Sequence, residues 1–275
     1  MVNKSINYII LFIIFLFFLF LIFVHFYNLF YSFNLVETFS DKKTVIPLNI
    51  YQTWNSHDTI PSNMKNLMDS IKDDNPEFNY KCYNNDDCIE FIKNNFDETI
   101  LDAYNRIIPG SYRSDLWRYC VLYINGGIYL DTKMKPINGF KFMSVTDKEY
   151  FVRDFNTSEK GVVTCFVVSK AKNERLLKSI NAIVDNVNNN YYGESSLSPT
   201  GPLLLKRFFT DDEINNLELE YCFNEDSSKT IISKVANSYK DAILERDDSI
   251  YSNQNKIHKR YNDYWSERNI YLPKM

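Results

Sequence analysis

The segment SDLWRYCVLYINGGIYLDTK, residues Ser114–Lys133, is the most informative stretch of this chain. Apolar residues recur in it at helical spacing, an Asn-Gly-Gly triplet then ends the helix, and a short apolar run indicates a buried strand that leads to Asp131. Asp115 and Arg118 stand three positions apart on the helix and are therefore neighbours. Because ligands bind beyond the carboxyl ends of strands in open α/β sheets, Asp131 and this charged pair are expected to meet at one crevice.

The quoted segment resembles the sugar-nucleotide-binding region of glycosyltransferase family 32, whose pattern is roughly (A/S)-D-x-x-R-Y-x-x-L-y-x-x-G-G-x-Y-x-D-x-D. The similarity continues in the order of that family from residue 46 to about residue 271. The further shared segments are IPLNIYQTW at residues 46–54, NPEFNYKCYNND at residues 75–86, the Thr-Gly-Pro run that starts at Thr200, and His258 and Trp265 near the end.

The alternation of strand and helix patterns along the chain argues for an α/β domain. The resemblance implies a Rossmann-like GT-A fold, and it relates the chain to fungal Golgi initiating mannosyltransferases. Besides the helix and strand of the quoted segment, we expect strands at residues 46–53, 150–153, 162–168, 230–235 and 242–244. The further expected helices lie at residues 61–72, 86–95, 97–106, 173–187 and 202–209.

The resemblance also implies roles for individual residues. Arg118, Asp131 and Lys133 are the expected catalytic residues, while Asp131 and His258 would bind a divalent cation, Mn²⁺ or Mg²⁺. Thr200 can in addition cap the helix expected at residues 202–209. The residues expected to bind a nucleotide diphosphate sugar are Trp54, Asp115, Arg118, Asp131, Thr200 and Gly201.

The chain departs from the family at Lys133, which replaces the second acidic residue of the D-x-D motif. Residues two apart on an extended strand face the same side, so a cation replaces one of two carboxylates that would share a metal ion. One interpretation is that Lys133 itself supplies positive charge to the diphosphate, which weakens or removes the need for a metal. The others are a solvated lysine with no role, or an inactive sugar-nucleotide-binding or glycan-binding protein on the same fold.

The amino-terminal stretch predicts a membrane anchor. Residues 8–33 are nearly all apolar and are long enough to cross a bilayer. Only weak cleavage sites follow, which favours an uncleaved signal anchor over a signal peptide. We therefore expect a cytoplasmic tail at residues 1–7, a transmembrane anchor at 8–33, a stem at 34–45 and a GT-A-like domain at 46–275. The distribution of lysines favours type II topology, with a luminal domain in the Golgi or endoplasmic reticulum.

The expected function is retaining transfer of a hexose from a nucleotide diphosphate sugar to a glycan, lipid or protein acceptor. The net charge of −4 makes a poor electrostatic footprint for nucleic acid, so no nucleic-acid partner is expected. The Asp-Thr-Lys triplet is also reminiscent of restriction-type nucleases, in which metal-bound carboxylates and a lysine activate water. The acidic domain, the apolar anchor and the Gly-Gly spacing all oppose that alternative.

Overall fold

A computed structural model describes residues 15–26, 44–154, 161–223, 229–233, 242–251 and 259–274. The chain divides into two compact units, Met1–Lys43 and Thr44–Met275. The first unit contains a helix at residues 15–26 whose large apolar side chains are exposed. None of the helices in the described ranges has both the length and the apolar character needed to span a bilayer. The rest of the predicted anchor, residues 8–14 and 27–33, lies outside the described residues.

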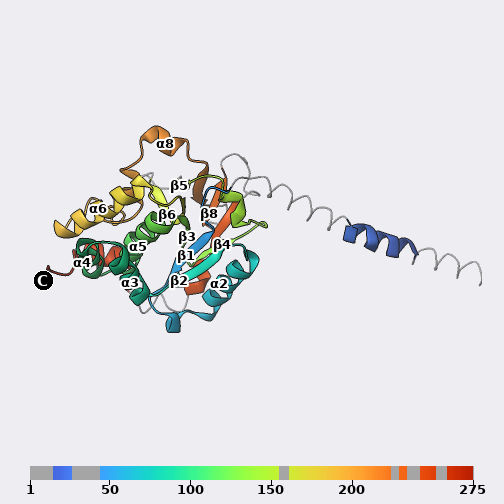
Figure 1. The fold of residues 1–275 in the computed structure, drawn as a ribbon, viewed down its shortest axis with the longest axis horizontal. Helices are drawn as coiled ribbons and strands as arrows, with labels where there is room; N and C mark the ends of the chain where they lie inside the picture. The colour runs from blue at the N-terminus through green and yellow to red at the C-terminus, as the bar shows by residue number, and fades with distance from the viewer. Residues whose placement is uncertain are drawn as a thin grey trace, which may run out of the picture. The chain divides into compact units, whose positions relative to one another are not determined.

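The second unit is built on a mixed β-sheet, shown in Figure 1. Its described strands follow the order β2-β1-β3-β6-β5-β7-β8-β9-β4. Strand β1 pairs in parallel with β2 and β3, whereas β6 lies antiparallel between β3 and β5. The strands are β1 (Asn49–Thr53), β2 (Asn79–Tyr83), β3 (Gly127–Leu130), β4 (Met134–Pro136), β5 (Tyr150–Asp154), β6 (Val162–Ser169), β7 (Leu219–Phe223), β8 (Lys229–Ser233) and β9 (Ala242–Arg246).

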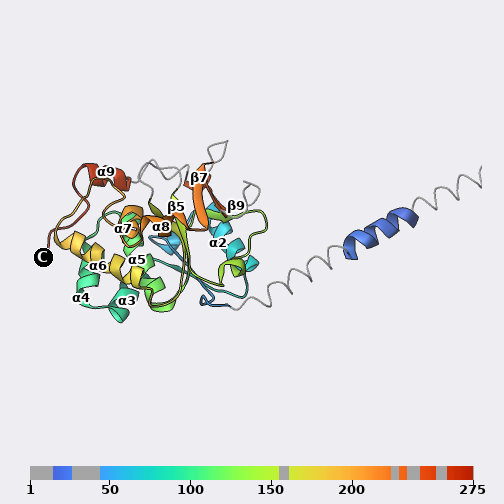
Figure 2. The same ribbon diagram turned by 90° about the horizontal axis from the view of Figure 1, so that it is seen from above.

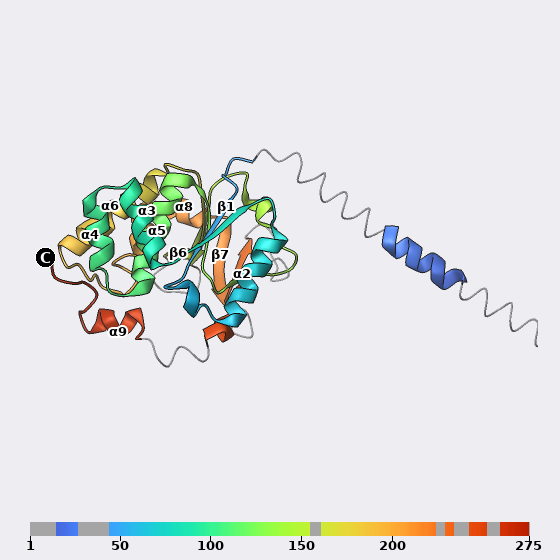
Figure 3. The same ribbon diagram turned by 60° about the horizontal axis from the view of Figure 1, so that its bottom comes forward.

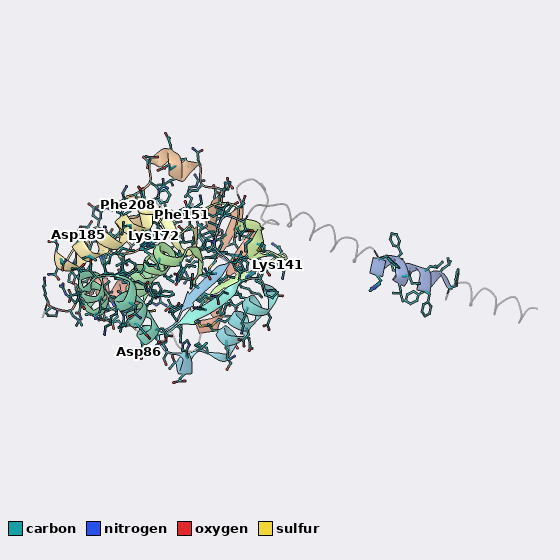
Figure 4. All side chains as sticks on the ribbon, viewed as in Figure 1. Asp86, Lys141, Phe151, Lys172, Asp185 and Phe208 are labelled. Atoms are coloured by element: carbon teal, nitrogen blue, oxygen red, sulfur yellow. The ribbon has the colours of Figure 1, made fainter. Side chains whose placement is uncertain are left out.

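Helices cover both faces of this sheet, as Figures 2 and 3 show. The helices α3 to α7 pack on one face and α2 on the other. Figure 4 labels one residue on each side of the sheet, Asp185 on α6 and Lys141 near α2. Lys141 forms an ion pair with Asp74 at the end of α2. The α-helices are α2 (Ser62–Asp74), α3 (Asn85–Asn95), α4 (Glu98–Arg106), α5 (Gly110–Asn125), α6 (Glu174–Asn188), α7 (Pro202–Lys206), α8 (Asp211–Asn215) and α9 (Tyr261–Ser266). The 3₁₀-helices are η1 (His57–Thr59), η2 (Phe142–Val145) and η5 (Asp248–Tyr251).

The alternation of side chains along β3 divides the core into two layers. Ile128 and Leu130 face the layer that contains α2 and η2, whereas Tyr129 faces the layer of α3 to α7. Helix α5 is buried from Leu116 to Leu122 because it lies between the sheet and the other helices of that layer. The central position of α5 and β3 explains why their junction controls the fold.

That junction requires glycine. Gly126 ends α5 with a φ of 63°, and a Cβ atom there would lie 2.6 Å from the backbone nitrogen of Ala171. Gly127 follows with a φ of 118°, and a Cβ atom would lie 2.7 Å from the carbonyl oxygen of Asn49. Backbone conformation and close packing therefore both exclude larger residues, so α5 can turn directly into β3.

The α/β class predicted from the sequence is confirmed. The apolar patterns of the sequence did not indicate strands β2, β4 and β7. Strand β2 lies at the sheet edge with mostly half-buried residues, so it lacks a strong apolar pattern, and β4 is only three residues long. The helix expected at residues 202–209 is shorter, and its cap is Gly201 without a side-chain bond. The prediction that Thr200 caps this helix is wrong, because its hydroxyl bonds to Asp115 instead.

Candidate functional site

Asp131 is the first residue after β3, where the chain leaves the sheet. Its backbone N–H donates to the carbonyl oxygen of Cys165 on β6 at 2.8 Å. Its own carbonyl oxygen accepts from Met134 N at 2.9 Å and from Gln52 Nε2 at 3.4 Å. These bonds close a tight turn directly after β3, so the backbone of Asp131 is held at the carboxyl end of the strand.

Arg118 lies buried between two carboxylates, with 5 % of its side chain exposed. Its Nη2 is 3.4 Å from Asp115 Oδ1 and 3.3 Å from Asp131 Oδ1. The other nitrogens donate to backbone carbonyls, Nε to Ser114 at 3.2 Å and Nη1 to Thr164 at 2.5 Å. Every nitrogen of the guanidinium thus has a partner, and the side chain has one fixed orientation.

Asp115 is held by two threonines as well as by Arg118. Thr164 Oγ1 on β6 donates to Asp115 Oδ1 at 3.2 Å, and Thr200 Oγ1 donates to Asp115 Oδ2 at 2.7 Å. Burial raises the pKa of Asp115, while the charge of Arg118 and the two hydroxyl donors oppose that rise. Both carboxylate oxygens of Asp115 therefore have partners inside the protein, and its binding of the donor stays a prediction.

Tyr129 joins Arg118 to Asp131. Its hydroxyl donates to Asp131 Oδ1 at 2.9 Å, and the guanidinium carbon of Arg118 lies 4.3 Å from the centre of its ring. Burial raises the pKa of Tyr129 well above its ordinary value, so the hydroxyl remains a donor at neutral pH. Asp131 is the accessible end of this cluster, with 39 % of its side chain exposed.

The structure corrects the geometry expected for Lys133. Residues 131–133 form a turn rather than an extended strand, so Lys133 does not simply repeat the direction of Asp131. The ammonium group of Lys133 instead lies 3.5 Å from Asp248 Oδ1, beyond the end of β9. The assumption that residues 131–133 continue as an extended strand is therefore wrong.

The structure places the remaining predicted residues as follows. Trp54 follows β1 at the same sheet edge as Asp131, and its Nε1 donates to Thr59 Oγ1 at 3.3 Å. Gly201 lies against the charged cluster, because a Cβ atom there would be 3.3 Å from Asp115 Oδ2. His258 lies outside the described residues.

Sequence reasoning missed two residues that shape this cluster. Tyr129 carried a usable signal, since it stands two positions before Asp131 on a strand and must face the same side. Thr164 carried no comparable signal, because its contacts with Asp115 and Arg118 depend on the pairing of β6 with β3.

These residues do not fit a conventional divalent-cation site. The described ranges contain no group of three or more His, Cys, Asp or Glu side chains that could hold a metal ion. Lys133 takes the place of the second carboxylate, and Asp131 Oδ1 already contacts Arg118 and Tyr129. Mg²⁺ is usually held by one or two carboxylates together with water and phosphate oxygens, and this cluster offers the accessible carboxylate of Asp131 in place of the pair of carboxylates in the motif.

We expect Thr200→Val to reduce the free energy of unfolding by about 1–3 kcal/mol, because it leaves a buried carboxylate oxygen without its donor. Thr146→Val is the matched control, since the equally buried Thr146 hydroxyl donates to the neutral carbonyl of Met143 at 2.9 Å. Urea unfolding of both variants measures the difference. Equal losses would mean that the bond to Asp115 has no special weight.

Two curated relatives match part of the chain. An uncharacterized glycosyltransferase of Acanthamoeba polyphaga mimivirus is 34% identical over 91 residues, which cover 33% of this chain and 36% of that protein. Inositol phosphoceramide mannosyltransferase 3 of Schizosaccharomyces pombe is 33% identical over 95 residues, which cover 34% of this chain and 26% of that protein. The match therefore spans about a quarter to a third of the length of these relatives.

Among solved structures, the PaToxG glycosyltransferase is similar with a TM-score of 0.45 and 18% identity, over 59% of this chain and 68% of that chain. The family model described as "Glycosyltransferase sugar-binding region containing DXD motif" matches residues 61–152. That range includes Asp115, Arg118 and Asp131, the three charged residues that meet at the end of β3. Residues 61–152 of this chain are therefore similar to glycosyltransferase sugar-binding regions that contain the DXD motif, with Lys133 in place of the second acidic residue.

Proposed function

We propose that this chain is a glycosyltransferase that moves a hexose from a nucleotide diphosphate sugar to a hydroxyl group of a glycan, a lipid or a protein. The observation that carries the proposal is the contact of Arg118 with both Asp115 and Asp131, inside the segment that matches the family. This cluster lies at the carboxyl end of β3, where ligands bind in open α/β sheets. The proposed fold type of the domain is accordingly GT-A.

In this proposal each residue of the cluster has a distinct task. Asp131 presents the accessible carboxylate to the donor, and Arg118 is the buried charge that orients it. Asp115 holds Arg118 in place through the contacts described above. Trp54, which follows β1 at the same end of the sheet, contacts the nucleotide base in this proposal.

The proposed reaction retains the anomeric configuration. The bond between the anomeric carbon and the diphosphate oxygen breaks, and a bond from the acceptor oxygen forms on the same face. The acceptor hydroxyl gives its proton to the departing phosphate oxygen, so the protein needs no nucleophile. Fixed positive charge near the diphosphate lowers the barrier because negative charge develops there in the transition state.

The family motif implies a divalent cation, Mn²⁺ or Mg²⁺, as cofactor, although the described residues do not fit a site for it. His258, expected as a further ligand, lies outside the described residues. The proposal also includes an amino-terminal membrane anchor at residues 8–33 and a luminal domain in the Golgi or endoplasmic reticulum. Protease protection of the domain in sealed vesicles would test that topology.

Donor hydrolysis by the 275-residue chain tests the proposed activity. We expect release of free hexose from a UDP- or GDP-hexose, and none from CMP-sugars, which lack a diphosphate. Binding of a nucleotide diphosphate sugar without hydrolysis or transfer would instead support the non-catalytic binding protein, which Lys133 in the DXD position favours. If no nucleotide sugar binds, both assignments fail.

A further inference from the structure

A second charged cluster lies next to the one that contains Asp131. The ammonium nitrogen of Lys133 and Nε of Arg246 both contact Asp248 Oδ1, at 3.5 Å and 2.8 Å. One carboxylate is therefore shared by two cations. The cluster made of Asp115, Arg118 and Asp131 has two carboxylates and one guanidinium, and so a net charge of −1.

The backbone brings these two clusters together. Strand β4 begins directly after the turn at residues 131–133 and pairs antiparallel with β9, with Met134 opposite Arg246. The N–H of Asp247 donates to the carbonyl oxygen of Lys133 at 2.9 Å. The turn that presents Asp131 is therefore also tied to the end of β9, which carries Arg246.

The side chains of Cys165 and Tyr221 also indicate that the two charged clusters lie close together. The backbone carbonyl of Cys165 accepts a hydrogen bond from the backbone N–H of Asp131. Burial raises the pKa of the Cys165 thiol, and the charge of Asp131 raises it further, whereas the charges of Arg118 and Arg246 lower it. Tyr221 on β7 lies within electrostatic range of Cys165, and its hydroxyl bonds to Arg246. Cys165 therefore lies within electrostatic range of both clusters.

The electrostatics of the second cluster favour an anionic ligand. Burial lowers the pKa of Lys133, and the positive charge of Arg246 lowers it further, while Asp248 and Asp131 oppose both effects. Only 20 % of the Lys133 side chain and 35 % of the Arg246 side chain are exposed, so water screens their repulsion incompletely. A bound polyanion would relieve this repulsion between the two cations.

We propose that Lys133 and Arg246 together bind the diphosphate group of the donor, and that they supply the positive charge for which the DXD motif uses a divalent cation. This inference rests on the proposed function and adds Arg246 and Asp248 to its site. A planar guanidinium and a compact ammonium group are both common ligands of phosphate oxygens. Asp248 then holds the two cations in place while the site is empty and competes with the diphosphate for them.

Binding of inorganic pyrophosphate to the 275-residue chain in excess EDTA tests this site without a sugar or a nucleotide. We expect binding by calorimetry in the absence of any divalent ion. Arg246→Gln and Lys133→Gln should each weaken it by about tenfold to a hundredfold, the scale of a lost charge-assisted hydrogen bond. Asp248→Asn should strengthen it about two- to fivefold, because the competing carboxylate is gone.

The matched control is Arg175→Gln. Arg175 pairs with Glu213 and has 34 % of its side chain exposed, close to the 35 % of Arg246, but it lies on α6. We expect this variant to bind pyrophosphate like the unchanged chain. Asp248→Asn also separates binding from mere structural support, since a damaged fold would weaken binding rather than strengthen it.

Two outcomes would overturn the inference. One is pyrophosphate binding that requires Mn²⁺ or Mg²⁺, and the other is binding that Arg246→Gln leaves unchanged. In either case, hydrolysis of a nucleotide diphosphate sugar by the same preparation would leave the proposed function standing. Conversely, metal-free pyrophosphate binding that is lost in both cation variants, without binding of any nucleotide sugar, would support the anion site and reject the proposed function.

Discussion

Arg118→Met should reduce the free energy of unfolding by about 3–5 kcal/mol, which is the largest effect on stability that we expect from a single substitution in this site. The variant removes the positive charge from between two carboxylates and leaves the buried carboxyl group of Asp115 without its cation. Methionine fills a similar volume, so the loss reports charge rather than a cavity. Urea unfolding of the full chain measures it.

The double variant Asp115→Asn/Arg118→Met measures how much of the lost stability comes from the carboxyl group of Asp115, which Arg118→Met leaves buried without a cation. Because neutral Asn can accept from one of the two threonine hydroxyls through Oδ1 and donate to the other through Nδ2, we expect it to recover part of the lost stability. Arg175→Met serves as the control, since solvent screens its exposed ion pair with Glu213 and the pair should contribute little to stability. Similar losses in Arg118→Met and Arg175→Met would contradict the central role of the buried pair.

Asp131→Asn should lower the rate of donor hydrolysis and of transfer by about 10²–10³-fold, the scale of losing one preorganised electrostatic group. Its effect on folding should be small, because its side chain is 39 % exposed and its backbone bonds are unaffected. Steady-state kinetics and urea unfolding of the same preparation measure both quantities. A large loss of activity with nearly unchanged stability is the result expected for a residue that contacts the donor.

Asp102→Asn is the matched control for Asp131→Asn. Asp102 is 46 % exposed and pairs at 3.5 Å with Arg106, of whose side chain only 6 % is exposed, so the two carboxylates stand in similar ion pairs. Arg106 binds the carbonyl oxygens of Val187 and Leu272, which indicates a structural role for that pair. If Asp102→Asn lost activity to the same extent as Asp131→Asn, the assignment of the donor site to the end of β3 would be rejected.

Much of the candidate site could be read from sequence because its central contacts are local. Asp115 and Arg118 stand one turn apart on α5, and the spacing of three residues alone makes them neighbours. Gly126 and Gly127 permit the abrupt turn into β3, which puts Asp131 at the end of that strand. The pairing of Asp131 with Arg118 then follows from packing α5 against β3.

The amino-acid sequence by itself thus determined the α/β class, the helix–turn–strand unit and its charged residues, since these depend on spacing within one helix or one strand. Only the tertiary structure decided which distant groups complete the site. Thr164 and Thr200 meet Asp115 across separations of 49 and 85 residues, and Lys133 meets Asp248 across 115. A helix or strand repeats its geometry from residue to residue, whereas such contacts depend on which strands pair and where the chain turns, as it does at residues 131–133.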